Sequence, residues 1–489
     1  MDNSPVIIQG VSRLIDGKRM RKWLPLFSIS SLVLNACAHS PELNSSSLKS
    51  HSDYVFANSF HTGNKTSWPE NKWWTRYNDP ELNTLIEEAI NDSPSLKAAE
   101  ARLKGADGIA QQIGATRYIQ SGISLSASES KVSYQYQAYA APKNWNDYGS
   151  ATLNFGYDFD FWGKNKSAIA AATSDYLAEQ AEVAAAKLML STALTQTYAE
   201  LTRLYANRDT AITALDIRNK TVSLIQNRFN NGLETKGAVR QAEALRANSE
   251  AELFSIDESI SLQKNALAAL LGKGPDRALS ISRPNIKLVA VFGLPKEAGV
   301  GLLGHRPDIT ASRCRAEAAS KRIGIAKAQF YPDVSLSVFI GVQSFHLDNL
   351  TKAGNDAGSI GPALYLPLFT GGRLQGQLTT AEANYEEAVA NYNNTLTQAF
   401  HDVADVVTSS KSLTARIEKT QDSVDAAQDA YQIANNRYRG GLATYLDVLT
   451  AEDVLLNSQK ALVNLQSRAF SLDVALIHAL GGGYQAAHS

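Results

Sequence analysis

Residues 150–161 read SATLNFGYDFDF, a strict alternation of two kinds of side chain. The odd-numbered positions from Ala151 to Phe161 are apolar or aromatic, whereas the even-numbered positions are small or polar and end in two aspartates. A period of two predicts a β-strand with one apolar face and one polar face. Strands of membrane barrels have this pattern, because one face contacts lipid and the other contacts water.

Three other stretches have related patterns. We therefore expect four strands, at about 118–130, 148–161, 332–343 and 359–369. The last stretch is the least regular, because Pro362 and Pro367 limit its hydrogen bonding.

A sheet of four strands has two edges whose backbone groups lack partners. Lipid offers no hydrogen bonds to such groups, so the strands of one chain cannot close a membrane barrel alone. Two chains would supply about eight strands and a packed interior, whereas three would supply about twelve strands and room for a lumen. The alternative is a half-buried hairpin in a soluble protein.

The chain contains an internal duplication. Residues 228–235, RFNNGLET, recur at 437–444 as RYRGGLAT, and matches continue at the same offset as far as Gly274 and Gly483. Matches of this number in one register predict two tandem copies of one unit, each with a helix, two strands and a long helix hairpin. The expected segments are repeat 1 at 81–274, an inter-repeat segment at 275–293, repeat 2 at 294–483 and a short tail at 484–489.

Long helices are predicted between the strands of one copy and the end of that copy. Proline is absent between Pro142 and Pro275 and after Pro367. As one helix, residues 164–229 would be about 100 Å long. Apolar and small residues spaced by three and four between 448 and 479 predict coiled-coil packing. These helices alone do not separate a duct from a soluble coiled-coil rod.

The N-terminus has the pattern of a secretory leader. Basic residues at 18–22 precede a mostly apolar run at 23–34 that is too short to span a bilayer. We expect residues 1–36 to be a signal peptide, with Met20 as a possible true start. The run ends in LNAC, which resembles a bacterial lipobox and predicts lipidation of Cys37; the alternative is an ordinary leader with an incidental cysteine. The other cysteine, Cys314, is expected to be a buried free thiol.

Composition and motifs exclude several classes of function. A net charge of −1 on 489 residues gives no electrostatic footprint for nucleic acid. Residues 299–304, GVGLLG, match the letters of a dinucleotide fingerprint, but Pro295 and a helical stretch separate them from the preceding strand-like run. The eight histidines show no metal-ligand spacing. We therefore expect no catalytic residues, no cofactor and no metal site, in a protein that is not an enzyme.

Five motifs, in this order and spacing, resemble the TolC-like outer-membrane efflux proteins, and in particular the lipoprotein branch that serves resistance-nodulation-division pumps. They are WWTRYNDPEL at 73–82, DFWGK at 160–164, HRPDI at 305–309, AKAQFYP at 326–332 and PLFTGGR at 367–373. The resemblance covers nearly the whole mature chain. It implies a mostly α protein with a membrane β-barrel portion, in which three chains form a twelve-stranded barrel, a long α-helical coiled-coil barrel and a mixed α/β equatorial belt.

The resemblance also implies where the segments lie. The belt would draw on the lipid-anchored segment at 37–80 and on the inter-repeat segment, where residues 288–292 read as a short strand. The protein would be anchored in the outer membrane of a Gram-negative bacterium, in contact with its lipid, and would extend about 100 Å into the periplasm. The C-terminal tail is expected to contribute little to the belt.

The function implied is passive conduction of drugs or other small toxic compounds to the exterior. The homotrimer would receive them from an inner-membrane transporter of the resistance-nodulation-division type through a periplasmic adaptor protein. Within the family, the alternative is the outer-membrane duct of type I protein secretion. Outside it, the alternatives are a stand-alone porin-like channel and a periplasmic coiled-coil scaffold without a pore.

The resemblance assigns two groups of residues near the duplicated turns. Those at the hairpin tips would dock the adaptor, and the candidates are Asn231, Gly232, Leu233, Thr235, Gly440, Gly441, Leu442 and Thr444. Those around and after the second tip would form the periplasmic aperture or gate, and the candidates are Arg437, Tyr438, Leu446, Asp447 and Asp453. The alternatives are simple turn geometry for the first group and a solvated helix face for Asp447.

Overall fold

The computed structural model describes residues 47–55, 59–60, 65–131, 144–286, 293–295 and 298–486. The predicted signal peptide, Cys37 and the short strand expected at 288–292 lie outside the described residues. The chain separates into two compact units. Unit 1 contains residues 116–166 and 323–382, and unit 2 contains residues 47–115, 167–322 and 383–489.

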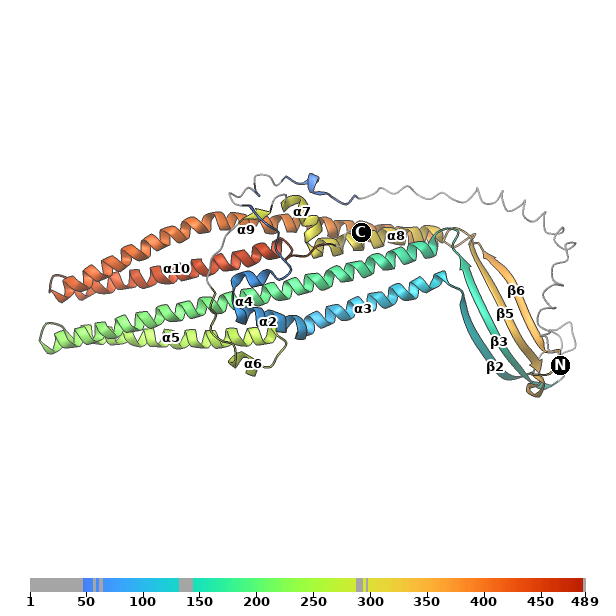
Figure 1. The fold of residues 1–489 in the computed structure, drawn as a ribbon, viewed down its shortest axis with the longest axis horizontal. Helices are drawn as coiled ribbons and strands as arrows, with labels where there is room; N and C mark the ends of the chain where they lie inside the picture. Colours follow the sequence, from blue (N-terminus) through green and yellow to red (C-terminus); the bar gives the residue numbers. More distant parts are fainter. Residues whose placement is uncertain are drawn as a thin grey trace, which may run out of the picture. The chain divides into compact units, whose positions relative to one another are not determined.

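Unit 1 is built on one antiparallel sheet of four strands (Figure 1). The strands are β2 (Gln120–Lys131), β3 (Trp145–Phe159), β5 (Asp333–Phe345) and β6 (Asp356–Tyr365), in the order β2-β3-β5-β6. The register brings the predicted apolar positions onto one face, because Leu153 lies opposite both Ile123 and Ile340. Among the described residues β2 and β6 are the edge strands of this sheet.

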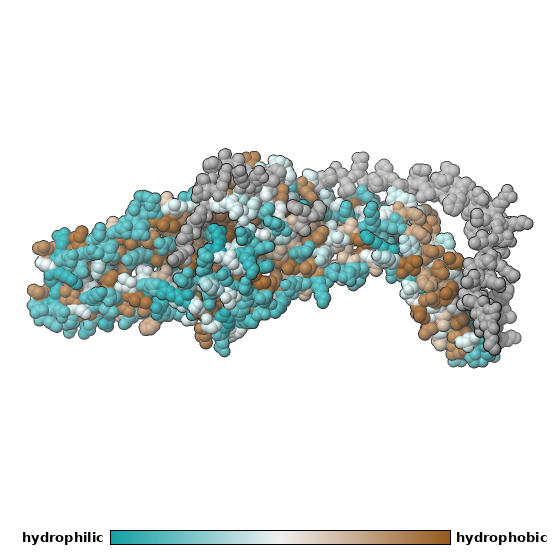
Figure 2. All heavy atoms as spheres, in the orientation of Figure 1, coloured by the Kyte–Doolittle hydropathy of each residue, from teal (hydrophilic) through white to brown (hydrophobic). Residues whose placement is uncertain are grey.

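The two faces of the sheet differ in character. On the apolar face, Ile123, Leu125 and Ile360 are each more than 70% exposed in the single chain. Figure 2 shows hydrophobic residues, in brown, over much of the visible surface of the strands. On the other face, the Ser126 and Ser150 hydroxyls are hydrogen-bonded at 2.7 Å. One face is thus suited to lipid and the other to water.

The fourth strand differs from its prediction. It covers residues 356–365 rather than 359–369, so it begins earlier and ends before Pro367. Pro362 lies within the strand, opposite Leu336. Proline is tolerated there because β6 is an edge strand, whose outer side needs no backbone donor within this chain.

Two of the family-like motifs meet where the sheet ends. The Trp162 ring stacks on Tyr331 with 4.6 Å between centroids, and its indole donates a hydrogen bond of 2.8 Å to the Pro332 carbonyl. Lys164 pairs with Asp333 at 3.1 Å. Motifs at 160–164 and 326–332, which are far apart in sequence, therefore form one junction between strands and helices.

The helices repeat in length, as a duplication requires. The long helices α4 (Lys164–Asn230) and α9 (Arg373–Arg439) each have 67 residues, which corresponds to about 100 Å. Each is followed by a helix of 35 residues, α5 (Lys236–Leu270) after α4 and α10 (Tyr445–Ala479) after α9. Figure 1 shows each pair as a hairpin, and these are called hairpin 1 (α4 and α5) and hairpin 2 (α9 and α10). The preceding helices are α3 (Pro94–Gly114) and α8 (Pro307–Ala328).

Unit 2 has several buried clusters along these helices. The largest joins residues 73–96 to both hairpins and includes Trp74, Leu194, Leu267 and Phe470. Cys314 is a buried free thiol, as predicted. Within the described residues, no helix is both long enough and apolar enough to cross a membrane.

Shorter elements lie between the long helices and the strands, some of them in the segments where a belt was expected. Strand β1 (Lys65–Thr66) pairs in parallel with β4 (Leu294–Pro295). Three-residue 3₁₀ helices lie at His51–Asp53, Ala115–Arg117 and Leu347–Asn349, and a longer one covers Trp73–Tyr77. The short α-helices are α2 (Pro80–Asp92), α6 (Asp276–Leu279) and α7 (Ala298–His305). The parallel pair β1 and β4 is two residues long, too short to show a period in the sequence.

The C-terminal glycines pack closely against distant segments. Gly481 has φ +85°, and a Cβ there would lie 1.8 Å from the His305 carbonyl oxygen. A Cβ on Gly483 would lie 2.3 Å from the Glu70 carbonyl carbon. Only glycine fits both the backbone angle and the space. The end of the second copy is thereby packed against Glu70 and against the turn between α7 and α8.

Candidate functional site

The two hairpin tips have the same backbone geometry. Gly232 and Gly441 have φ angles of +76° and +74°, which favour glycine. The amide of the following leucine bonds back to an arginine carbonyl at 2.8 Å in both tips, from Leu233 to Arg228 and from Leu442 to Arg437. The predicted tip residues thus form two copies of one helix-ending turn.

The tip threonines begin the next helices. The Thr235 hydroxyl accepts a hydrogen bond of 3.1 Å from the Ala238 amide, and Thr444 accepts one of 3.3 Å from the Asp447 amide. The Asp447 carboxylate in turn accepts a hydrogen bond of 2.7 Å from the Thr444 amide, which completes a capping box. Hydrogen bonding from the Thr444 side chain and amide lowers the pKa of Asp447. Asp447 is therefore exposed and ionised while it caps α10.

Tyr438, predicted at the aperture, is buried between the two hairpins. It is 2% exposed, and its hydroxyl donates a hydrogen bond of 2.6 Å to Glu234 Oε1 in the first tip. The Arg228 guanidinium lies 4.6 Å from the centre of the ring and donates to the Tyr438 carbonyl at 3.2 Å. Burial raises the pKa of the Tyr438 phenol, and the Glu234 carboxylate raises it further. These three residues, Arg228, Glu234 and Tyr438, are called the tip lock.

A second polar cluster lies two turns further along α10. The Glu452 side chain is fully buried, and its Oε1 lies 2.9 Å from Arg218 Nε on α4. The Arg218 Nη2 donates to Asp453 Oδ1 at 2.7 Å. Burial raises the pKa of Glu452 to about 7, although Arg218 opposes that rise. Arg218, Glu452 and Asp453 are called the buried clamp, which joins the long helix of hairpin 1 to hairpin 2.

Both clusters break the symmetry of the duplication. Arg218 corresponds to Ala427 in the second copy, and Glu234 corresponds to Ala443. The counterpart of buried Glu452 is Glu243, which forms a surface pair with Arg240 at 2.6 Å. In these two clusters the first copy supplies Arg218 and Glu234, and the second copy has alanine at both equivalent positions.

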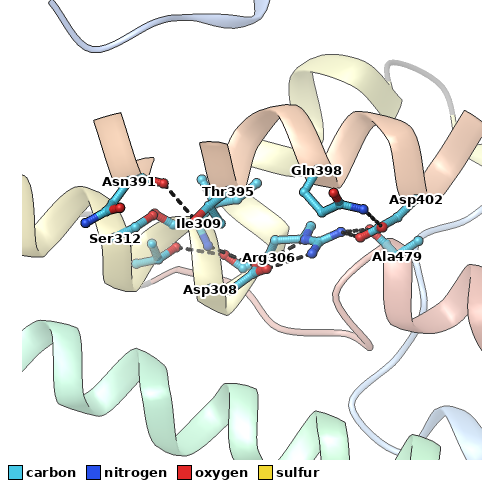
Figure 3. Close-up of polar contacts among 10 residues, drawn as sticks. Arg306, Asp308, Ile309, Ser312, Asn391, Thr395, Gln398, Asp402 and Ala479 are labelled. Carbon is cyan, nitrogen blue, oxygen red and sulfur yellow. Dashed lines mark hydrogen bonds and ion pairs between the residues drawn. The ribbon is translucent and has the colours of Figure 1, made fainter. Parts of the chain in front are cut away.

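A third cluster surrounds Arg306 at the start of α8 (Figure 3). Its guanidinium is buried and forms two bonds to Asp308, of 3.0 and 2.6 Å, and one of 2.9 Å to Asp402 on α9. It also donates to the Ala479 carbonyl at the end of α10, at 3.3 Å. Burial opposes its charge, but these carboxylates hold the pKa of Arg306 above its ordinary value. Gln398 supports Asp402 at 2.9 Å, so the network ties together α8, α9 and α10.

Comparison with protein families identifies the family of this chain. The family model described as outer membrane efflux protein matches residues 85–273 and 300–482, which is most of the chain and spans both hairpins. The chain belongs to the outer membrane efflux protein family. These two matched stretches lie within the segments expected as the two repeats.

Individual relatives agree with this assignment. The multidrug resistance outer membrane protein MdtP of Escherichia coli K12 is 30% identical over 474 residues, which cover 94% of this chain and 95% of that protein. The crystal structure of the outer membrane protein VceC of Vibrio cholerae has a TM-score of 0.82 and 63% identity, over 86% of this chain and 100% of VceC. The Campylobacter jejuni CmeC outer membrane channel has a TM-score of 0.83 at 24% identity, over 93% of this chain and 96% of CmeC.

This efflux protein therefore has the predicted fold, that of the TolC-like trimeric outer-membrane channels. It is an outer-membrane channel component of a tripartite efflux system. The members of its family are channels rather than enzymes. Among the described residues, no group of three or more histidine, cysteine, aspartate or glutamate side chains could hold a metal ion.

The structure brings several predicted residues of the efflux protein together and adds others. Tyr438 and Asp453 each contact hairpin 1, whereas Leu233, Leu442 and Leu446 are exposed by 63%, 74% and 68%. Arg437 is exposed and donates to the Leu442 carbonyl at 3.3 Å. Asn231 and Gly440 lie in the turns at the two hairpin tips. Sequence reasoning missed the partners Arg218, Arg228, Glu234 and Glu452, although the charge differences between copies were a signal for two of them.

Proposed function

We propose that three copies of this chain form a duct that passively conducts small amphipathic toxic compounds to the exterior. An inner-membrane transporter of the resistance-nodulation-division type supplies them through a periplasmic adaptor. The observation that supports this most is the combination, in one chain, of a sheet with two open edges and two hairpins built on helices of 67 residues. Three such sheets supply twelve strands, enough for a lumen.

The tips are proposed as the docking surface for the adaptor. Leu233 and Leu442 are exposed large apolar side chains at equivalent positions of the two turns. Isolated exposed leucines are common, but a pair repeated at two tips in each of three chains gives a ring of six equivalent contacts. The remaining candidates, from Asn231 to Thr235 and from Gly440 to Thr444, would support this ring through turn geometry and helix capping.

The tip lock and the buried clamp are proposed to hold the aperture closed. Both connect hairpin 2 to hairpin 1 of the same chain, so loss of these hydrogen bonds and ion pairs would allow hairpin 2 to move. Leu446 and Asp447, exposed at the start of α10, would then line the opening as threefold rings. Arg437, which is bonded to the turn, would move with them.

A lipid anchor at Cys37 is proposed from the lipobox-like sequence LNAC at 34–37. Its test is metabolic labelling with an alkyne palmitate analogue. Cys37→Ser should lose the label, whereas Cys314→Ser should keep it. Equal labelling of Cys37→Ser and the parent would refute the anchor.

The experiment that tests the export function is susceptibility profiling of a strain that lacks this gene. We expect lower inhibitory concentrations for dyes, detergents and several antibiotics, restored by the complementing gene. An unchanged profile together with a missing secreted protein would indicate type I secretion instead. High conductance of the purified protein without any mutation would indicate a free porin, and recovery in the soluble fraction without conductance would indicate a scaffold.

A further inference from the structure

A cavity of about 440 Å³ lies in unit 2 between the N-terminal segment and the end of α10. Its apolar wall contains two indole rings and three aliphatic side chains, which are Trp68, Trp73, Leu476, Ile477 and Leu480. Trp73 is 4% exposed, and Trp68 is held in place by stacking on His305 at 4.0 Å. A cavity of this size with aromatic walls is of the kind that binds small molecules.

One buried carboxylate lines this cavity. Asp473 is 4% exposed, and its Oδ2 accepts a hydrogen bond of 2.7 Å from the Tyr77 hydroxyl. Its Oδ1 accepts no hydrogen bond from the described residues, because Arg76 Nη2 stands 3.6 Å away, beyond hydrogen-bond range. The Arg76 side chain is 46% exposed, so it lies at the mouth of the cavity and not inside it. Asp473 Oδ1 therefore has a counter-ion at ion-pair distance but no hydrogen bond, so a cation that reaches it directly would compete with Arg76.

The other charged groups in the lining are Glu70, Lys72 and Arg76. Lys72 is paired with Glu87, which is outside the cavity lining, at 2.9 Å. Glu70 has no ion-pair partner in the described part of the chain. Among the lining cations, Arg76 is the one that pairs with Asp473 in the described part of the chain. Indole faces add further attraction for a cation.

We propose that this cavity binds a small amphipathic organic cation. The cationic head lies against Asp473 Oδ1, where it competes with Arg76, and the apolar body lies against Trp73 and Leu480. Binding would bridge residues 66–76 and the end of α10. The site is separate from the hairpin tips, and the inference does not depend on the proposed export function.

The test is calorimetric titration of the purified full-length protein in detergent, with benzyltrimethylammonium as the probe and benzyl alcohol as its neutral counterpart. The protein should bind the cation and not the alcohol. Asp473→Asn keeps the shape and an acceptor for Tyr77 but removes the charge, so it should weaken binding at least about ten-fold. Asp422→Asn, an exposed carboxylate on α9 that pairs with Lys419, is the matched control and should bind as the parent does.

A second variant keeps the test decisive if Asp473→Asn does not fold. Arg76→Gln removes the competing guanidinium and should tighten binding of benzyltrimethylammonium several-fold. Equal affinity of Asp473→Asn and the parent would overturn the proposal. So would equal binding of the alcohol and the cation, or weaker binding by Arg76→Gln.

Discussion

The Tyr438 hydroxyl donates a hydrogen bond of 2.6 Å to the Glu234 carboxylate, although 204 residues separate them in sequence. The bond runs from the tip of one hairpin to the tip of the other. Together with Arg228 over the ring, it makes the two tips of one chain a single packed body. A hydrogen bond to a charged acceptor of this kind contributes about 1.5–3 kcal/mol.

Tyr438→Phe removes only the hydroxyl, so it should loosen the tip lock without leaving a cavity. We expect the purified channel in planar bilayers to open more often and to show several-fold higher mean conductance. Tyr176→Phe on α4 is the matched control and should behave as the parent does. A double-mutant cycle with Glu234→Gln should show coupling of about 1–2 kcal/mol in thermal stability. Additive effects would mean that the two residues do not act as one unit.

The buried clamp predicts a pH dependence whose sign follows from Glu452. The pKa of Glu452 is about 7 in the packed state, against 4.5 for an exposed glutamate, so the packed state binds more protons between these values. The contribution of Glu452 to the packing of hairpin 2 is therefore fully present below about pH 4.5 and is lost as the pH rises through about 7. The groups that face Glu452 are Arg218 on α4, Tyr431 on α9, and Tyr445 and Asp453 on α10.

Glu452→Gln mimics the protonated residue and should flatten this dependence. The measurement is the thermal midpoint of the purified protein from pH 5 to pH 8, with Glu243→Gln, the surface counterpart in the first copy, as control. A midpoint that rises with pH in the parent, or a slope that survives in Glu452→Gln, would show that another group titrates.

Two glycines with similar backbone angles should differ sharply in tolerance. Gly441→Ala places a Cβ in open space, so its cost is the left-handed conformation alone, about 1–2 kcal/mol. Gly481→Ala meets the His305 carbonyl oxygen at 1.8 Å and should prevent stable folding or require a shift of the backbone. Chemical denaturation of both variants measures the difference. Similar losses would mean that the C-terminal turn is less tightly packed than described.

The Arg306 network should be sensitive to a conservative change. Lys cannot form the paired contact with Asp308 and reach Asp402 and the Ala479 carbonyl at once, so Arg306→Lys should destabilise the protein by about 3–5 kcal/mol. Arg313→Lys, at an exposed arginine with one ion pair of 3.7 Å to Glu317, should change stability by less than about 0.5 kcal/mol. Thermal denaturation of the purified protein checks both values.

The docking proposal rests on the exposed tip leucines. Leu233→Asp combined with Leu442→Asp should abolish cross-linking to the adaptor in cells while expression and thermal stability stay unchanged, because neither side chain is part of the core. Leu279→Asp is the control, since Leu279 in α6 is 82% exposed but distant from the tips in sequence. Retained cross-linking in the double variant would place the adaptor elsewhere.

The sheet could be predicted from the sequence because the alternation of apolar and polar residues lies within each strand. Alternation in residues 150–161 identifies both faces of β3, and the register then aligns Leu153 with apolar partners on two neighbouring strands. The end of β6 was harder, because the sequence pattern alone does not show that pairing with β5 stops at Tyr365, opposite Asp333, before Pro367 is reached. The parallel pair of β1 and β4 has two residues in each strand and no period to detect.

The charged clusters could not be predicted in the same way. An arginine in a helix pattern indicates a solvated face, yet Arg218 is buried because α10, over 200 residues later, supplies Glu452 beside it. The aperture candidates Tyr438 and Asp453 were identified by family resemblance, but their partners were not. Comparison of the two copies would have identified Arg218 and Glu234 as unusual, since each corresponds to an alanine in the other copy.

The open edges of the sheet have a kinetic consequence. β2 and β6 can complete their hydrogen bonds only with other copies, so the rate of closure depends on how often chains meet. At low chain concentration, unassembled chains would persist longer in an aggregation-prone state. The lipid anchor proposed at Cys37 would confine chains to a surface and raise their effective concentration. The anchor would then serve assembly more than attachment, and its loss should slow trimer formation most at low expression.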